Sequence, residues 1–424
     1  MSEHPEGRLE LPAVDGVAAV LDDVDLAGLD LRGADLRGVK LRRAKLSGID
    51  LRGADLGGAS FGKADLRRAV LDEANLRFAD LVGADLRGAS LASVDCRGAM
   101  LEESRLGRAG MRFAKLDDAT LEGADLRAAD LWGASLAGVE AGGADLRGAI
   151  LREADLRGAD LAGANLRGTS LGKALLAKAG LRGADLRRAT VEGVDFSDAD
   201  LRDAKLQGLD LTSCNLARVR LSGTWLEKTR FGLDQVGDAV GEELAGEHDD
   251  ARKAYLGLER LFQDLGDPDA ASWAYRRKRR MQKLDALGRA QAARSRRDWR
   301  GAMTNYANYA SDQVVEWVCD YGESIPRVLL SMLAVYVVFT LIYGVTGSVM
   351  HVEKTPAGVE VKTPTHRPID LAIFSLMAMT TSGSSSAGLE PRDALVYLLT
   401  GLQALMGIAL TGLLGFVMGN LVRR

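Results

Sequence analysis

The sequence predicts a composite chain in which a stacked coil of short extended segments is followed by an α-helical linker and an α-helical membrane module. Three observations predict this order. A large apolar residue recurs at every fifth position from Leu21 to Phe231, helical spacing of apolar residues follows between 255 and 284, and two uncharged stretches occupy 328–350 and 394–422. A chain of 424 residues is long enough for two or three domains that differ in composition.

The overall charge gives no bias toward nucleic acid or acidic ligands, because 55 Lys and Arg against 59 Asp and Glu leave a net charge of −4. The cysteines, Cys96, Cys214 and Cys319, have neither the number nor the spacing of a disulfide framework or a zinc site. We therefore expect buried thiols in a reducing compartment. The lead-in, residues 1–20, begins with charged residues and no apolar core, so we expect no secretory signal and a cytosolic N-terminal part.

Residues 21–231 form 43 consecutive five-residue units without an insertion. In most units a small residue, usually Ala, stands two positions before the large apolar one, with Asp or Asn between them, as in ADLRG at 34–38. Positions two apart share a face of an extended segment, so Ala and Leu point inward and Asp outward. Arg-Gly suits a corner. Stacked coils of this kind bury ladders of Leu and Ala at a spacing of roughly 4.8 Å.

This pattern resembles the pentapeptide-repeat family, and the resemblance covers about half of the chain. It implies a right-handed quadrilateral β-helix with four units per turn. The 43 units then give about 11 coils and a rod roughly 50 Å long. Ala suits the narrow interior, where a larger side chain would overpack.

Three roles can be considered for the rod: a DNA mimic, a solvated surface with a protein-docking face, and an enzyme. Some family members imitate DNA and bind topoisomerases, but residues 1–233 carry 34 Lys and Arg against 37 Asp and Glu, whereas a DNA mimic should be strongly acidic. We therefore favour a solvated surface on which outward Asp and Arg side chains neutralise one another, with a protein-docking face that the sequence does not locate. The units contain no convergent group of catalytic type, so we expect no enzyme and no nucleic-acid partner.

Residues 232–325 are predicted to be a helical linker. Seven acidic residues lie between 234 and 250, with no Lys or Arg. Helical periodicity then runs from Tyr255 to Leu265, breaks at GDPD, and resumes from Trp273 to Leu284, with Pro268 suited to the first turn of the second helix. We expect this helical pair to cap the open end of the β-helix.

A basic run follows, with eleven Lys and Arg between 276 and 300. Because the run lies shortly before the first apolar stretch, we expect it to contact anionic cytoplasmic lipid or other subunits rather than nucleic acid. Trp317, in the amphipathic stretch 311–327, is predicted to be an interfacial anchor.

Residues 326–424 are predicted to contain two transmembrane helices, since 328–350 and 394–422 both exceed the roughly 20 apolar residues that cross a bilayer. The Lys and Arg bias predicts a multi-pass plasma-membrane protein with the rod and the C-terminus cytoplasmic and 351–393 external. The apolar segment 369–380 is too short to cross and is predicted to be re-entrant, lining a water-filled path.

This part resembles the two-transmembrane pore module of the potassium-channel superfamily, with an outer helix, a pore helix, a filter and an inner helix. The family pattern is Thr-Thr followed by Val-Gly-Tyr-Gly-Asp; two Thr and one Gly match, but Ser replaces the Val, the Tyr, the second Gly and the Asp. Strict potassium selectivity is therefore not carried over, and the resemblance implies a permeant monovalent cation of open identity, without a bound cofactor or metal. The implied filter residues are Thr380, Thr381, Ser382, Gly383, Ser384 and Ser385, within a stretch that runs to Ser386.

The second span is rich in glycine, as the family's inner helix is. The resemblance implies a hinge at Gly407, whereas Gly412, Gly415 and Gly419 fit either a hinge or small-residue helix packing. Phe416 and Asn420 are candidates for a lower constriction.

Together these features predict a prokaryotic-type homotetrameric cation channel whose cytosolic rods bind a ligand or protein, or one another, and regulate gating. Four subunits are expected because one filter segment cannot surround an ion, and closed rotational symmetry is the usual solution. The alternative is a membrane-anchored scaffold for protein–protein interaction that does not conduct. A DNA-mimic topoisomerase binder is the least favoured prediction.

Overall fold

The computed structural model describes residues 2–3, 9–10, 19–354, 360–381 and 387–422. The chain divides into two compact units, Met1–Gln282 and Lys283–Arg424, and each is described by itself. In the first unit, β1 (Ser2–Glu3) pairs antiparallel with β2 (Leu9–Glu10), ahead of the repeats.

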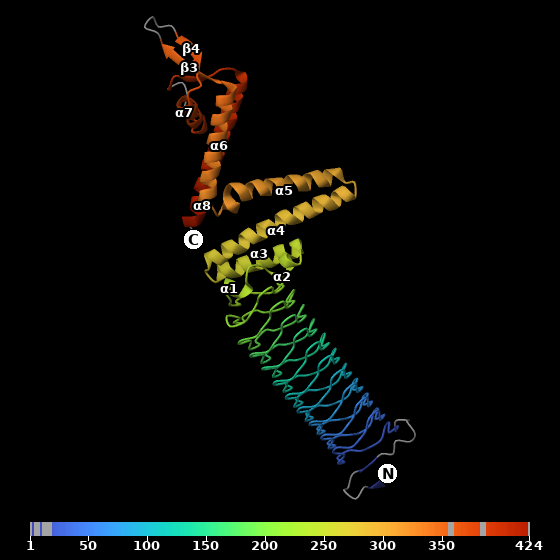
Figure 1. Cartoon of the computed structure of the whole chain (residues 1–424). Helices are drawn as coiled ribbons and strands as arrows, with labels where there is room; N and C mark the ends of the chain where they lie inside the picture. Colours follow the sequence, from blue (N-terminus) through green and yellow to red (C-terminus); the bar gives the residue numbers. More distant parts are fainter. Residues whose placement is uncertain (1, 4–8, 11–18, 355–359, 382–386, 423–424) are drawn as a thin grey trace. The chain divides into compact units, whose positions relative to one another are not determined.

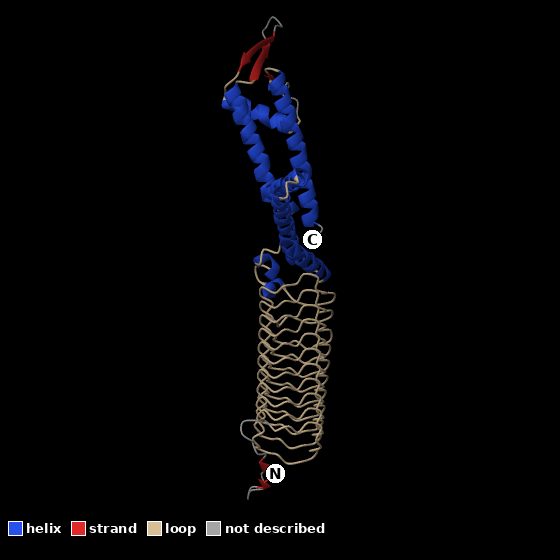
Figure 2. Cartoon of the chain, turned by 90° about the vertical axis from the view of Figure 1, so that its right-hand side faces the viewer, coloured by secondary structure: helices blue, strands red, loops and turns tan. Residues whose placement is uncertain are grey.

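The five-residue repeats wind into a four-sided β-helix (Figures 1 and 2). Parallel bridges join residues 20 apart, from Val20 and Lys40 at one end to Asp210 and Arg230 at the other. A spacing of 20 means that four units complete each turn, so the predicted quadrilateral β-helix is confirmed. Backbone N–H groups donate to carbonyl groups of the neighbouring coils at 2.6 to 3.2 Å, which gives the stack a continuous hydrogen-bond ladder.

The core of the β-helix is the predicted pair of ladders. The large apolar residue and the small residue of each unit are buried along nearly the whole stack, for example Leu46, Ala54 and Phe61, which have no exposed surface. At nearly every corner the second residue has a left-handed φ, which explains the frequent Gly there, such as Gly53 at +63°. Cys96 and Cys214 lie in the inner ladders as buried free thiols, as predicted.

Helices cover the last coils of the β-helix, as the sequence predicted. The helices are α1 (Leu233–Val236), α2 (Gly241–Leu244), α3 (His248–Asp264) and the start of α4 (Pro268–Ser295). The Glu242 carboxylate is fully buried and accepts hydrogen bonds from the backbone N–H groups of Leu221 at 2.7 Å and Ser222 at 2.6 Å. Gln235 Nε2 donates to the Leu211 carbonyl at 2.7 Å. These groups satisfy ladder positions that have no further coil to pair with.

The basic run occupies α4 and the turn into α5 (Trp299–Cys319). Much of it is paired inside the chain, which the sequence did not predict. The pairs include Arg277 with Glu243, Lys278 with Glu259, Lys283 with Glu316 and Arg289 with Asp285. Contact of the remaining cations with lipid stays a prediction.

The second unit continues through a short 3₁₀ turn (Asp320–Gly322) into α6 (Ile325–Thr346), α7 (Pro368–Met379) and α8 (Ala394–Val422). Between them lies a sheet that the sequence analysis did not predict. Its strands are β3 (Val349–Lys354), β4 (Glu360–Pro364) and β5 (Leu389–Pro391), in the order β4-β3-β5, with both pairs antiparallel. The polar segment before α7 therefore contributes two paired strands, β3 and β4.

Candidate functional site

Helices α6, α7 and α8 pack against one another in all three pairs. Within the described residues, α6 and Ala394–Gly419 of α8 are long and apolar enough to cross a membrane, by length and composition. Most of their side chains remain uncovered within the chain, which differs from the buried core helix of a soluble domain. Helix α7 spans 12 residues and is apolar but too short to cross.

A buried polar network ties the three helices together. The Tyr343 hydroxyl of α6 donates to Gln403 Oε1 of α8 at 2.9 Å. Gln403 Nε2 donates to Ser375 Oγ of α7 at 2.7 Å and to the Ser375 carbonyl oxygen at 3.1 Å, and the Ser375 hydroxyl donates to the Tyr336 carbonyl oxygen at 3.1 Å. Tyr343, Ser375 and Gln403 have no exposed surface. The network therefore fixes α7 against both neighbours by directional bonds as well as by packing.

An apolar cluster surrounds this network. The Tyr343 and Phe374 rings meet edge to face with centroids 5.1 Å apart, and Phe339 packs beside Tyr343. Leu389 of β5 is buried in the same cluster, which joins the sheet to the helices. A second cluster contains Cys319 and joins the N-terminal end of α6 to the C-terminal part of α8.

The two ends of α7 differ chemically. Pro368 stands in the first turn, and Asp370 accepts a hydrogen bond from the Thr365 hydroxyl at 2.8 Å, which places a carboxylate near the positive end of the helix dipole. At the other end the Thr380 hydroxyl donates to the Leu376 carbonyl oxygen at 2.9 Å. Thr381 has a left-handed φ of 59°, which turns the chain out of the helix. Such a turn is unusual for a β-branched residue and marks a constrained position.

The structure places two of the predicted filter residues, Thr380 and Thr381, at the C-terminal end of α7, and both are exposed. Ser382, Gly383, Ser384 and Ser385 lie outside the described residues, as does Ser386. The chain after them is held in place, because the Gly388 carbonyl oxygen accepts a hydrogen bond from Val352 N–H at 2.7 Å and Leu389 pairs with His351. The filter-like stretch is thus bracketed by α7 on one side and by β5 on the other.

The glycines of α8 fall into two groups. A Cβ added to Gly407 would lie 2.1 Å from the Met379 carbonyl oxygen, so this glycine permits the close approach of α8 to the end of α7. A Cβ at Gly412, Gly415 or Gly419 would meet nothing within 4 Å in the chain. Helix α8 continues through Gly407, and the hinge assigned to it stays a prediction.

The constriction candidates lie in the last turns of α8. Phe416 is 58% exposed within the single chain. The side chain of Asn420 lies outside the described residues. Neither placement tests the predicted constriction.

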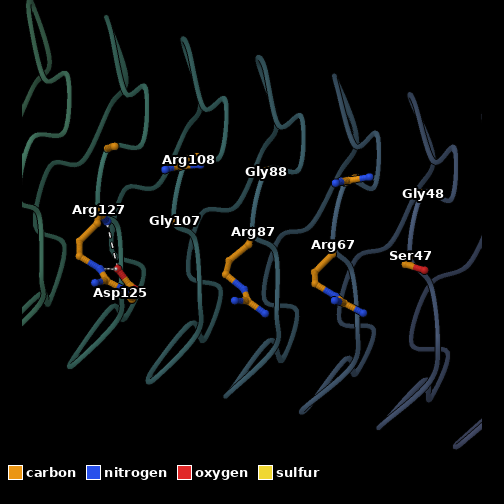
Figure 3. Close-up of a pocket in the computed structure, with 11 residues that line it drawn as sticks. Ser47, Gly48, Arg67, Arg87, Gly88, Gly107, Arg108, Asp125 and Arg127 are labelled. Carbon is orange, nitrogen blue, oxygen red and sulfur yellow. Dashed lines mark hydrogen bonds and ion pairs between the residues drawn. The ribbon is translucent and has the colours of Figure 1, made fainter.

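A second site lies on the β-helix, where sequence reasoning located none. It is a groove of about 1040 Å³ in which Arg67 and Arg87 lie on neighbouring coils and the coil of Gly107 separates them from Arg127 (Figure 3). Arg67, Arg87 and Arg127 each pair with the Asp two residues earlier, at 2.6 to 2.7 Å. The hydrogen bonds from Arg127 hold the pKa of Asp125 below its usual value. Arg68 and Arg108 also line the groove. The recurrence of these arginines is present in the sequence, but it becomes visible only when residues are compared at intervals of 20.

No described segment of the chain gathers three or more His, Cys, Asp or Glu side chains into a group that would hold a metal ion.

Comparison with known proteins identifies the repeats. The family model for pentapeptide repeats matches residues 19–108, 114–193 and 195–232. Pentapeptide-repeat proteins fold as right-handed quadrilateral β-helices, in agreement with the architecture described above. A search of curated proteins finds no match.

Several solved structures are similar to the repeat region. HetL, a pentapeptide-repeat protein involved in heterocyst differentiation regulation in the cyanobacterium Nostoc sp. strain PCC 7120, is 33% identical, over 49% of this chain and 87% of HetL, with a TM-score of 0.21. A pentapeptide-repeat protein from the thylakoid lumen of Arabidopsis thaliana is 33% identical, over 30% of this chain and 72% of that one, with a TM-score of 0.16. QnrB1, a plasmid-mediated fluoroquinolone resistance protein, is 20% identical, over 54% of this chain and 98% of that one, with a TM-score of 0.31.

Proposed function

The chain belongs to the pentapeptide-repeat family, and on that premise we propose that its β-helix is the cytosolic part of a homotetrameric, cation-conducting membrane channel. The observation that carries the proposal is the docking of a short apolar helix, α7, between two helices of membrane-crossing length. Two helices that only anchored the chain in a membrane would need neither α7 nor a polar network that holds it.

The ends of α7 support a cation path. A helix directs the partial negative charge of its last carbonyl groups beyond its C-terminus, here toward Thr380 and the stretch that follows. Four such ends around an axis would favour a cation at their centre.

The exposed surfaces of α6 and α8 support an oligomer in a bilayer. Leu330 and Leu398 are 63% and 71% exposed, and Gly412 and Gly415 face open space in the single chain. Apolar side chains of this kind meet lipid, while small residues let helices of neighbouring subunits approach. The Lys and Arg before α6 favour a cytoplasmic position for the rod.

Recording from the purified full-length chain in planar bilayers tests the proposal. We expect single-channel cation currents whose reversal potential under biionic conditions changes in Ser382→Val and Gly383→Ala variants. Glu360→Gln, on the exposed strand β4, is the matched control and should leave the reversal potential unchanged. Stable oligomers that carry no current would contradict conduction and favour the membrane-anchored interaction scaffold.

We further propose that the rods regulate gating, because each rod is covalently continuous with a pore module. A chain lacking residues 1–231 should open with a different probability from the full chain in the same bilayers. An unchanged open probability would remove this regulatory role and leave conduction standing.

A further inference from the structure

The winding of the β-helix sorts its outward charges onto four sides, and the sides differ. Each side is made of the outward residue of one extended segment and the two corner residues after it, repeated every 20 residues. Between residues 80 and 178, two neighbouring sides carry opposite excess charge, and the other two are nearly balanced. The balanced sides have three Lys or Arg against two acids, and four against four.

The acidic face is the side that begins with Asp80. Over residues 80–163 it carries six carboxylates and no Lys or Arg. None of the six has an ion-pair partner among the described residues, and Glu102 Oε2 is buried without a hydrogen bond. The six are Asp80, Glu102, Glu103, Glu122, Glu140 and Asp160.

The basic face is the adjacent side, one corner further along each coil. Over residues 85–168, the same height along the rod, it carries six arginines against three aspartates. Arg87, Arg127 and Arg147 pair with those aspartates. Arg105, Arg108 and Arg167 have no ion-pair partner in the described part of the chain, and Arg108 lines the groove of Figure 3.

In the acidic column Glu102 stacks on Glu122 and Glu140 stacks on Asp160, which is unfavourable because neighbouring coils bring these like charges within one strand spacing, about 4.8 Å. Such a column is relieved by an opposite charge from outside the rod. The unpaired arginines and the unpaired carboxylates stand at matching heights on neighbouring sides, so each face supplies what the other lacks.

We propose that the rods associate with one another in a closed ring of four, the acidic face of each rod lying against the basic face of the next. When square rods are related by a four-fold axis along their length, each rod meets its two neighbours through two adjacent sides, at equal height. The acidic face and the basic face are adjacent sides of the rod and lie at equal height, so they meet both conditions. A contact between different faces is heterologous and closes at four because the sides are a quarter-turn apart. This inference rests on the proposed tetramer and names the surface by which its rods recognise each other.

Paired cysteines test the contact in the full-length protein in membranes. The three native thiols should react little with the cross-linker, because all are buried; burial raises the pKa of Cys96 to about 12 and that of Cys214 to about 11, and it also raises the pKa of Cys319. With a short bismaleimide, the Glu103→Cys/Arg108→Cys double variant should give cross-linked dimers, trimers and tetramers. Each single variant should give none, since a residue does not meet its own copy in a heterologous contact.

The matched control pair is Arg112→Cys/Asp117→Cys, which lies in the same coil on the two other sides and should not cross-link. Cross-linking of a single variant would overturn the heterologous contact. A tetramer by light scattering whose Glu103→Cys/Arg108→Cys rods do not cross-link would overturn this inference and leave the proposed channel intact. A monomeric protein would overturn both.

Discussion

The glycines of α8 differ in the space that they leave for an added methyl group. At Gly407 it would lie 2.1 Å from the Met379 carbonyl oxygen, whereas at Gly412 it would meet nothing within 4 Å. We expect Gly407→Ala to lower the stability of the full chain in detergent by about 1–3 kcal/mol, a usual cost of overpacking. Gly401→Ala, at a glycine of α8 where an added Cβ would likewise meet nothing within 4 Å, should leave the thermal midpoint unchanged. Equal effects of the two substitutions on that midpoint would contradict the close approach.

Glu242 offers a second test at the same scale. Its carboxylate accepts two backbone hydrogen bonds at the end of the β-helix, while burial raises its pKa. Glu242→Ala leaves two buried N–H groups without an acceptor and should cost roughly 2–5 kcal/mol in denaturant unfolding of the full chain. Glu242→Gln keeps an oxygen acceptor and removes the charge, so it should retain most of the stability. If the Glu242→Gln variant were as unstable in denaturant unfolding as the Glu242→Ala variant, the charge itself would be required.

Among the elements, α7 depends most on its neighbours, because an apolar helix of 12 residues has little stability of its own. Gln403→Leu removes the amide that joins Tyr343 to Ser375, and hydrogen bonds between membrane helices contribute about 0.6–2 kcal/mol. We expect faster hydrogen–deuterium exchange of the α7 amides in this variant. Leu402→Ala changes an adjacent side chain that is half exposed and serves as the control. Unchanged exchange in α7 would show that packing alone holds it.

The elements also differ in how far the sequence predicts them. The β-helix follows directly from a period of five, because each unit carries its own inward residues and its own corner. Helix α7 follows from an apolar run, and the structure gives Pro368–Met379 against the predicted 369–380. The sheet was missed because β3 and β4 were judged by their prolines and charges, although the alternation in VEVK at 359–362 was a strand signal.

The candidate site was predicted only in part, because the sequence reveals residues that are close together along the chain but not pairs that are far apart. Residues such as Thr380 and Thr381 stand out because they are close together in the sequence. Gln403 and Ser375 are 28 positions apart and lie in runs that look uniformly apolar, so no local pattern pairs them. The two charged faces were likewise hidden by a net charge near zero, which averages over four different sides.

At the scale of the whole molecule, the Asp–Arg pairs of the β-helix should make its stability depend on pH. Hydrogen bonds from the Arg two residues later lower the pKa of these aspartates, that of Asp30 to about 2 from a usual 3.8. Because the folded pKa lies below the unfolded value, this stabilisation is present above about pH 4 and is lost as the pH falls toward 2. The thermal midpoint of the β-helix, followed by circular dichroism, should therefore fall as the pH is lowered from 4 to 2.

A chain with Asp125→Asn and Asp145→Asn should show a smaller fall over the same range, since both of those aspartates have lowered pKa values. A midpoint that stays constant down to pH 2 would contradict the contribution of the pairs.

The interval of 20 residues between stacked positions also makes the rod sensitive to the length of any insertion or deletion. Removing one five-residue unit would leave every local motif intact, yet it would turn all coils on one side of the cut by a quarter-turn relative to those on the other. The acidic column would then be split between two sides. Removing four units would shorten the rod by one coil and restore the alignment. The number of residues inserted into this rod therefore determines whether the outward side chains on the two sides of the insertion stay aligned.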